Sequence, residues 1–220
     1  MGGLGFELCR WLGREYQARL LVIGRSPLGE EQASSIRSGK IGQDARARYE
    51  TLRGEAADCI YAPADVGDAD AVRALVEHAE AVWHRPLDGI FHLAGIANER
   101  RIEQESVEAF RRAGRPKVQG INALGGLLER RREAFLIAFS SVNAMFGGSG
   151  VGGYSAANAY MEARCRQLFR SGLRVFFHAW SSWHGLGMSK DSGTESAAAA
   201  KGFRPIPLED GIHSLRAALQ

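Results

Sequence analysis

Short apolar runs alternate with amphipathic helical patterns along most of this 220-residue chain. A run that is apolar throughout suits a strand buried on both faces, as in a parallel sheet covered by helices. The segment 71–84, between two such runs, has its apolar residues at helical spacing. The alternation predicts an α/β fold with a doubly wound parallel sheet, in three layers α/β/α. The predicted strands are Leu20–Ile23, Cys59–Ala62, Gly89–Leu93, Ala134–Phe139 and Arg174–Trp180.

Composition narrows the class of protein. Apolar residues make up 45% and charged residues 24%, as in an ordinary globular domain, so we expect one domain over residues 1–220. The net charge is +3, and we interpret the densest cluster, Arg130–Arg132, as a solvated helix end rather than a nucleic-acid surface. No 18-residue apolar run and no secretory signal are present, so we expect no membrane partner. Cys9, Cys59 and Cys165 suit neither a disulfide framework nor a zinc site, which predicts reduced thiols, no metal and a cytoplasmic location.

Glycines at the start of the chain suggest a phosphate-binding turn. Gly2, Gly3 and Gly5 surround Leu4 ahead of an amphipathic stretch, and glycines at a helix start let backbone N–H groups approach a pyrophosphate. The strand that ends at Ile23 is followed by Arg25 and Ser26, where an arginine accommodates the 2′-phosphate of NADP. A flexible terminus and a surface turn are the alternatives. Together the features predict a Rossmann-like fold that binds NADP(H) through Gly2, Gly3, Leu4, Gly5, Arg25 and Ser26.

A glycine fingerprint of this kind follows a first β-strand, yet only Met1 precedes it here. In a doubly wound sheet that strand is central, and losing it would expose about five apolar side chains. We therefore expect a chain that is incomplete at its N-terminus, with the first strand missing. A longer chain should then resist urea better, and equal midpoints would contradict this. The segment 29–42, rich in Ser and Gly, predicts a loop.

Four residues in the second half suggest a reaction site. Ser141 closes a predicted strand, and Tyr154 follows 13 residues later at an expected helix start, so both can converge on one substrate carbonyl. Asn158 stands four residues after Tyr154, and Lys117 stands 37 residues before it. Each alone is an ordinary cap or surface residue, but their joint order favours one site. The glycine-rich segment 146–153 then forms the flexible rim of a substrate entrance.

This combination resembles the ketoreductase (KR) domains of modular polyketide synthases, in the short-chain dehydrogenase/reductase superfamily. The likeness covers essentially the whole chain. It rests on Tyr-x-x-x-Asn at 154–158, on the Lys-Val-x-Gly element at 117–120, and on the segments 64–66, 92–95 and 179–188. The resemblance implies NADPH-dependent reduction of a β-ketoacyl thioester, carried by an acyl carrier protein, to the β-hydroxyacyl form. It also implies other synthase domains as partners, and no nucleic acid.

The resemblance assigns a role to each residue. Tyr154 would be the general acid, and Lys117 would make its phenolate accessible and hold the nicotinamide ribose. Ser141 would donate to the carbonyl oxygen, and Asn158 would orient Lys117 or a relay water. The implied cofactor contacts in this half of the chain are Asp65, Val66, Ala94, Gly95, Lys117 and Tyr154.

Some positions depart from the family pattern. The residues that set product stereochemistry in the family are not matched, because Ala97-Asn98-Glu99 replaces Leu-Asp-Asp and Phe146 replaces Trp. Asn122 lies one position before the usual Asn. Two other functions stay open: an inactive KR remnant with a structural role, and a free-standing reductase of a small ketone. NADPH binding by fluorescence tests the first, and comparing a carrier-bound substrate with a free ketone tests the second.

Overall fold

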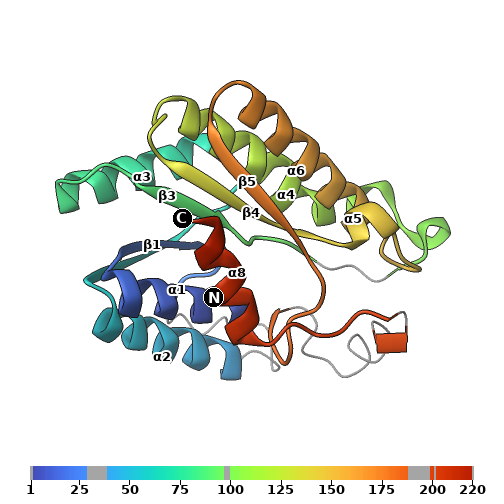
Figure 1. Cartoon of the computed structure of the whole chain (residues 1–220), viewed down its shortest axis with the longest axis horizontal. Helices are drawn as coiled ribbons and strands as arrows, with labels where there is room; N and C mark the ends of the chain where they lie inside the picture. Colours follow the sequence, from blue (N-terminus) through green and yellow to red (C-terminus); the bar gives the residue numbers. More distant parts are fainter. Residues whose placement is uncertain (1, 29–38, 97–99, 188–198, 201, 220) are drawn as a thin grey trace. The chain divides into compact units, whose positions relative to one another are not determined.

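The computed structural model describes residues 2–28, 39–96, 100–187, 199–200 and 202–219 (Figure 1). They divide into two compact units, Met1–Ala64 with Ser182–Gln220, and Asp65–Ser181. In chain order the elements are α1 (Gly3–Tyr16), β1 (Arg19–Gly24), α2 (Gly39–Glu55), β2 (Asp58–Pro63), α3 (Ala69–Trp83), β3 (Gly89–His92), η1 (Ile102–Gln104), α4 (Val107–Glu129), β4 (Phe135–Ser141), α5 (Asn143–Phe146), α6 (Gly152–Arg170), β5 (Arg174–Trp180) and α8 (Leu208–Ala218).

In the first unit, two parallel strands pack against helices. β1 pairs with β2 from Arg19 opposite Asp58 to Gly24 opposite Pro63. Leu20, Leu52 and Cys59 form the buried core, so β1, α2 and β2 each supply one residue to it. The α1 residues that pack against this core are Phe6, Cys9 and Leu12, which recur at helical spacing.

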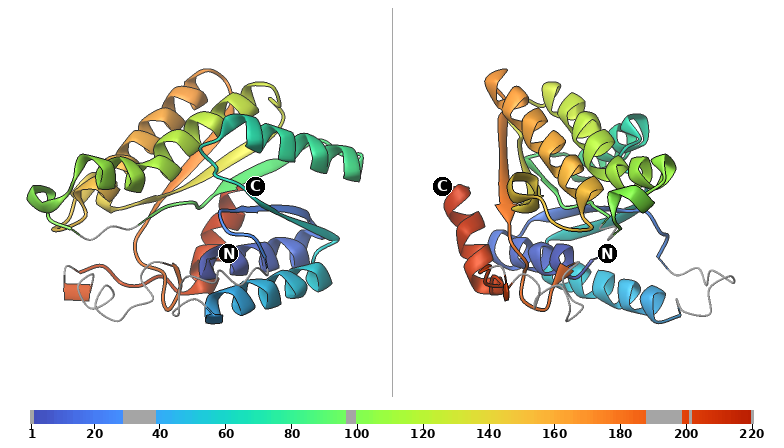
Figure 2. Two further views of the ribbon diagram at one scale, coloured as in Figure 1. Left: turned by 180° about the vertical axis from the view of Figure 1, so that it is seen from behind. Right: turned by 90° about the vertical axis from the view of Figure 1, so that its right-hand side faces the viewer.

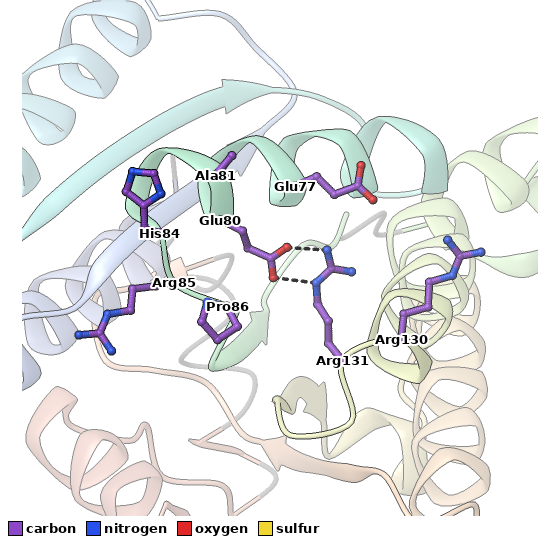
Figure 3. Close-up of a pocket in the computed structure, with 8 residues that line it drawn as sticks. All are labelled: Glu77, Glu80, Ala81, His84, Arg85, Pro86, Arg130 and Arg131. Atoms are coloured by element: carbon purple, nitrogen blue, oxygen red, sulfur yellow. Dashed lines mark hydrogen bonds and ion pairs between the residues drawn. The ribbon is translucent and has the colours of Figure 1, made fainter.

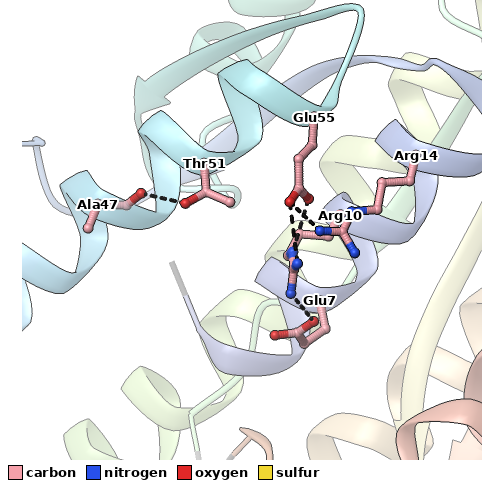
Figure 4. Close-up of polar contacts among 6 residues, drawn as sticks. All are labelled: Glu7, Arg10, Arg14, Ala47, Thr51 and Glu55. Carbon is pink, nitrogen blue, oxygen red and sulfur yellow. Dashed lines mark hydrogen bonds and ion pairs between the residues drawn. The ribbon is translucent and has the colours of Figure 1, made fainter.

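Ion pairs fasten α1 to α2, as Figure 4 shows. The Arg10 guanidinium donates to Glu55 through Nε at 3.0 Å and also pairs with Glu7 on its own helix. Arg14 donates to the same Glu55 carboxylate, so one acidic residue at the end of α2 holds two arginines of α1. The C-terminal helix α8 joins α1 in the same way, through Arg216 and Glu15.

In the second unit, three parallel strands form a sheet in the order β3-β4-β5. The central strand β4 is the most deeply buried, because Leu136, Ile137 and Ala138 are fully inaccessible. Helices α4 and α6 lie side by side against this sheet (Figures 1 and 2). Helix α3 begins at an Asp68 cap, whose carboxylate accepts the N–H of Ala71 at 3.0 Å.

The Glu80 carboxylate, near the C-terminal end of α3, binds the segments that follow α3 and α4. Glu80 accepts two hydrogen bonds from Arg131, at 2.8 and 2.6 Å, and one from the Leu87 backbone N–H at 2.9 Å. The ion pair lies in a pocket at the end of α3, with His84 and Arg85 also on its wall (Figure 3). One side chain thus connects α3, the segment before β3 and the segment before β4.

The sequence predicts this architecture well. All five predicted strands are present, every pairing between them is parallel, and the α/β class is confirmed. The predicted loop 29–42 is wrong at its end because α2 begins at Gly39; residues 29–38 lie outside the described part. Where the sequence predicts one doubly wound sheet, the described strands form two parallel sheets, β1-β2 and β3-β4-β5. In the described part of the chain, no helix has the length and apolar character to cross a membrane.

Candidate active site

Helix α6 carries two of the four candidate catalytic residues. Tyr154 lies in its first turn, and Asn158 follows one turn later on the same side. Asn158 is completely buried, and its Nδ2 donates to the Tyr154 carbonyl at 2.9 Å. Its Oδ1 is buried without a hydrogen-bond partner. A buried acceptor of this kind suits a water molecule or an ammonium group.

The third candidate, Ser141, is the last residue of β4. Its Oγ accepts the backbone N–H of Asn143, the first residue of α5, at 3.2 Å. This contact uses an acceptor lone pair of the hydroxyl and leaves the O–H proton to be donated. Ser141 is therefore prepared to act as a hydrogen-bond donor at the end of the strand.

Ser141, Tyr154 and Asn158 lie close together. The side chains of Ser141 and Asn158 lie close enough to the Tyr154 hydroxyl to lower its pKa. Burial is the larger effect, so the pKa of Tyr154 is raised overall. The expected lowering by Lys117 is not seen in this structure: the two neutral side chains are the groups that oppose the effect of burial.

Lys117 lies in α4, directly after the buried Pro116. Its side chain is buried, and Nζ donates to the carbonyl of Phe139 on β4 at 2.8 Å. Burial lowers the pKa of Lys117 to about 8. Gly95 permits this position, because a Cβ there would lie 3.1 Å from the Lys117 Cε. The turn after β3 and the end of β4 thus both contact the lysine.

His92, at the end of β3, is a second buried titratable group near Lys117. Burial lowers the pKa of His92 to about 3, with a further lowering by Lys117, while a hydrogen bond to the Pro116 carbonyl opposes it. The imidazole is therefore neutral at physiological pH, so it places no charge beside Lys117. A Cβ at Gly120 would lie 3.0 Å from the imidazole, which explains the glycine.

Asp65 and Val66 pack against the same part of α4. Asp65 accepts the N–H of Gly67 at 2.9 Å and pairs with the Arg115 guanidinium at 2.7 Å. A Cβ at Gly120 would lie 3.1 Å from Val66. The segment Arg115–Gly120 therefore contacts both the 65–67 turn and the 92–95 turn. Sequence reasoning missed this, because the three motifs are far apart along the chain.

The other candidate cofactor residues belong to the first unit. Gly2 caps α1 without a side-chain hydrogen bond, and space is open where a Cβ would stand on Gly2 and Gly5. A helix start without a side-chain cap leaves backbone N–H groups that can receive a phosphate, whereas a Cβ on Gly3 would lie 3.7 Å from the Leu186 side chain. The use of Gly2, Gly3, Leu4 and Gly5 for a pyrophosphate stays a prediction. Arg25 and Ser26 follow β1, both exposed; the Ser26 carbonyl accepts the hydroxyl of Tyr61.

The sequence departs from the family pattern at residues 97–99, at Phe146 and at Asn122, and the structure differs in what it shows of each. Residues 97–99 lie outside the described part of the chain. Phe146, at the end of α5, is 67% exposed. Asn122 does not join the cluster, because its amide exchanges hydrogen bonds with the Tyr160 hydroxyl, with Nδ2 donating at 3.0 Å.

A parallel sheet with a strand that ends in a serine, and a following helix that brings a tyrosine to that serine, define a class of protein. They are the framework of the short-chain dehydrogenases/reductases, oxidoreductases that depend on a nicotinamide cofactor. Within that class the chain belongs to the KR domain family, whose model matches residues 1–185.

Comparisons with known proteins agree with this assignment. The chain is 29% identical over 212 residues to a phenolphthiocerol/phthiocerol polyketide synthase of Mycobacterium tuberculosis, covering 94% of this chain and 11% of that protein. It is 30% identical over 217 residues to polyketide synthase PksM of Bacillus subtilis, covering 96% of this chain and 5% of that protein. The chain thus spans about a tenth or less of the length of these relatives.

Solved structures show the same fold. A ketoreductase from the first module of phoslactomycin biosynthesis in Streptomyces sp. HK803 matches with a TM-score of 0.82 and 26% identity, over 97% of this chain and 47% of that one. The first ketoreductase of the tylosin polyketide synthase matches with a TM-score of 0.80 and 29% identity, over 100% and 44%. Family membership implies ketoreduction in polyketide biosynthesis.

Proposed function

We propose that this chain is a single NADP-binding domain that reduces a β-ketoacyl thioester, held on an acyl carrier protein, to the β-hydroxyacyl form. The observation that carries the proposal is the convergence of Ser141 and Asn158 on the Tyr154 hydroxyl. These relatives are much longer synthases, which supports the proposal that the chain acts together with other synthase domains.

Ser141 and Tyr154 have different roles in the proposed reaction. Reduction of a ketone turns its oxygen into an alkoxide, which needs hydrogen-bond donors and then a proton. Ser141, whose Oγ already accepts from the Asn143 N–H, donates to the ketone oxygen. Tyr154 transfers its proton to that oxygen. Since burial raises the pKa of Tyr154, the tyrosine is protonated at neutral pH, which is the state a general acid requires.

Lys117 and Asn158 have supporting roles in the proposed reaction. Lys117 has three N–H donors and gives one to the Phe139 carbonyl, which leaves donors for the nicotinamide ribose. The free Oδ1 of Asn158 accepts from a relay water or from Lys117. A nicotinamide cofactor, when bound, supplies the hydride.

We also propose NADP(H) as the form of the cofactor. Gly2, Gly3, Leu4 and Gly5 receive its pyrophosphate, while Arg25, with Ser26, receives the 2′-phosphate. Asp65, Val66, Ala94 and Gly95 contact it within the second unit. Arg25 is exposed and follows β1, which leaves its guanidinium accessible to a phosphate.

Replacing Tyr154 tests this proposal. Tyr154→Phe removes only the hydroxyl, so kcat for a β-ketoacyl thioester should fall about 100-fold or more. NADPH binding, followed by its fluorescence, should be nearly unchanged. Tyr160→Phe is the matched control, because Tyr160 lies on the same helix but its hydroxyl contacts Asn122. Full turnover by Tyr154→Phe would overturn the assignment.

NADPH binding and turnover of the unchanged protein distinguish the two alternative functions. A chain that binds no NADPH and reduces nothing would support a structural remnant. Faster reduction of a free ketone than of the carrier-bound thioester would support a free-standing reductase. Preference for the carrier-bound thioester supports the proposed function.

A further inference from the structure

A buried carboxylate, which is not one of the four candidate catalytic residues, lies one turn beyond Asn158 on α6. Glu162 follows Tyr154 by two turns of α6, and its side chain is only 9% exposed. Its Oε1 accepts a hydrogen bond from the Ser140 hydroxyl at 2.6 Å, a contact that is itself buried. A carboxyl group is costly to bury unless its oxygens have partners, so the contacts of Glu162 indicate what holds it in place.

The second oxygen of Glu162 has a charged partner. Oε2 pairs at 3.2 Å with Arg166, one turn further along α6. The Arg166 guanidinium in turn lies 4.7 Å from the centre of the Phe177 ring on β5. Glu162 is thus fixed at both oxygens: one faces β4, and the other faces an arginine that rests on β5.

The place of Ser140 gives this contact its importance. Ser140 directly precedes Ser141 in β4, so holding the Ser140 side chain restricts the backbone that places Ser141. Tyr154, Asn158 and Glu162 recur every four residues on one side of α6. The Ser140–Glu162 bond therefore joins the strand that carries the serine donor to the helix that carries the tyrosine.

We propose that Glu162 is a positioning residue, which clamps the end of β4 to α6 through Ser140 and so sets the separation between the Ser141 and Tyr154 hydroxyls. Its effect on turnover rests on the proposed function, whereas the clamp itself does not. Ser140 and Glu162 are both buried and bonded to each other, so loosening the clamp should slow the reaction while leaving substrate affinity almost unchanged.

Kinetics of three variants test the effect on the reaction. Ser140→Ala and Glu162→Ala should lower kcat about 10-fold with KM changed by less than about twofold. Glu162→Gln keeps an oxygen that can accept from Ser140, so it should recover most of the loss. Arg164→Gln is the control, because Arg164 lies on the same helix and contacts Gln167 and Glu129 instead. Equal losses in Glu162→Gln and Glu162→Ala, or a rise in KM with unchanged kcat, would overturn the proposal.

A titration separates the clamp from the catalytic assignment. The ultraviolet absorbance of the Tyr154 phenolate, isolated by subtracting each variant's Tyr154→Phe counterpart, gives the pKa of that tyrosine without any turnover. Since Ser141 lowers this pKa, Ser140→Ala and Glu162→Ala should raise it, while Arg164→Gln should not. An unchanged pKa in correctly folded Ser140→Ala overturns the clamp. Absence of turnover in the unchanged protein, with the pKa shifts present, would instead count against the proposed function alone.

Discussion

Lys117 is the most unusual residue of the site, because its ammonium group is buried with a neutral histidine beside it. Burial lowers the pKa of Lys117 to about 8, whereas a lysine in an unfolded chain titrates near 10.4. The folded state therefore penalises the charged lysine. A lysine held in this way reaches its neutral form at a pH where other lysines stay charged.

The pH dependence of stability follows from this shift. The penalty is complete below the folded pKa of about 8, and it disappears as pH rises to the unfolded value, so the free energy of unfolding should increase across this window. The full effect is roughly 3 kcal/mol. Lys117→Met removes the titrating group, so the stability of the unchanged protein relative to Lys117→Met should rise between pH 8 and 10 in urea unfolding. Parallel curves would contradict the buried lysine.

At the residue scale, the sequence predicts which candidate side chains lie together better than it predicts their individual contacts. Ser141, Tyr154 and Asn158 could be grouped because strand end and helix start are readable from local pattern. The partners of Lys117 could not, because its contact with the Phe139 carbonyl joins residues from different elements. Glu162 was missed for the same reason: a glutamate inside a helix is ordinary until its burial is known.

Among the elements, α8 depends on a close approach that only glycine allows. A Cβ at Gly211 would overlap the indole of Trp183, a buried side chain of the same unit. Gly211→Ala should therefore lower the free energy of unfolding by about 1–3 kcal/mol, because helix or indole must move. Gly54→Ala, in α2, is the control: nothing lies near its Cβ position, so it should be neutral or stabilising by up to about 1 kcal/mol. Urea unfolding distinguishes the two.

The Glu80 contacts of Figure 3 give a second prediction for the elements. Hydrogen bonds from Arg131 and the Leu87 N–H lower the pKa of Glu80, so its contribution to stability is present above the unfolded pKa of about 4.3 and is lost as pH falls below it. Glu80→Gln should cost about 1–2 kcal/mol at pH 7 and progressively less in acid. Glu77→Gln, from the wall of the same pocket, should change stability less. An equal loss at pH 7 and pH 3 would count against this role.

The elements themselves were largely predictable, with informative exceptions. The five strands are found because each carries a short, largely apolar run, although only β4 is buried along most of its length in the described residues. The start of α2 was missed because Gly39 and Gly42 lower helix propensity, so local composition favoured a loop. The helix nevertheless begins at Gly39 and continues through Gly42.

For the whole molecule, hydrogen exchange should separate the two sheets. β4 is paired on both edges and its interior residues are inaccessible, whereas β1 is paired only with β2 among the described residues. Backbone amides of residues 135–141 should therefore exchange more slowly than those of residues 19–24. Mass spectrometry of exchanged peptides provides the measurement. Faster exchange in β4 than in β1 would show that the sheet of the second unit is not the more stable one.

All four candidate catalytic residues lie in Asp65–Ser181, which is a single uninterrupted stretch of the chain. Such a stretch can be exchanged between genes with two crossovers, at 64/65 and 181/182, without dividing the cluster. Chimaeras that receive this stretch from another KR domain should inherit the donor's turnover properties. They should keep the recipient's preference between NADPH and NADH, because Arg25 lies outside the exchanged part. The candidate catalytic residues can thus be inherited together, separately from Gly2–Gly5 and Arg25.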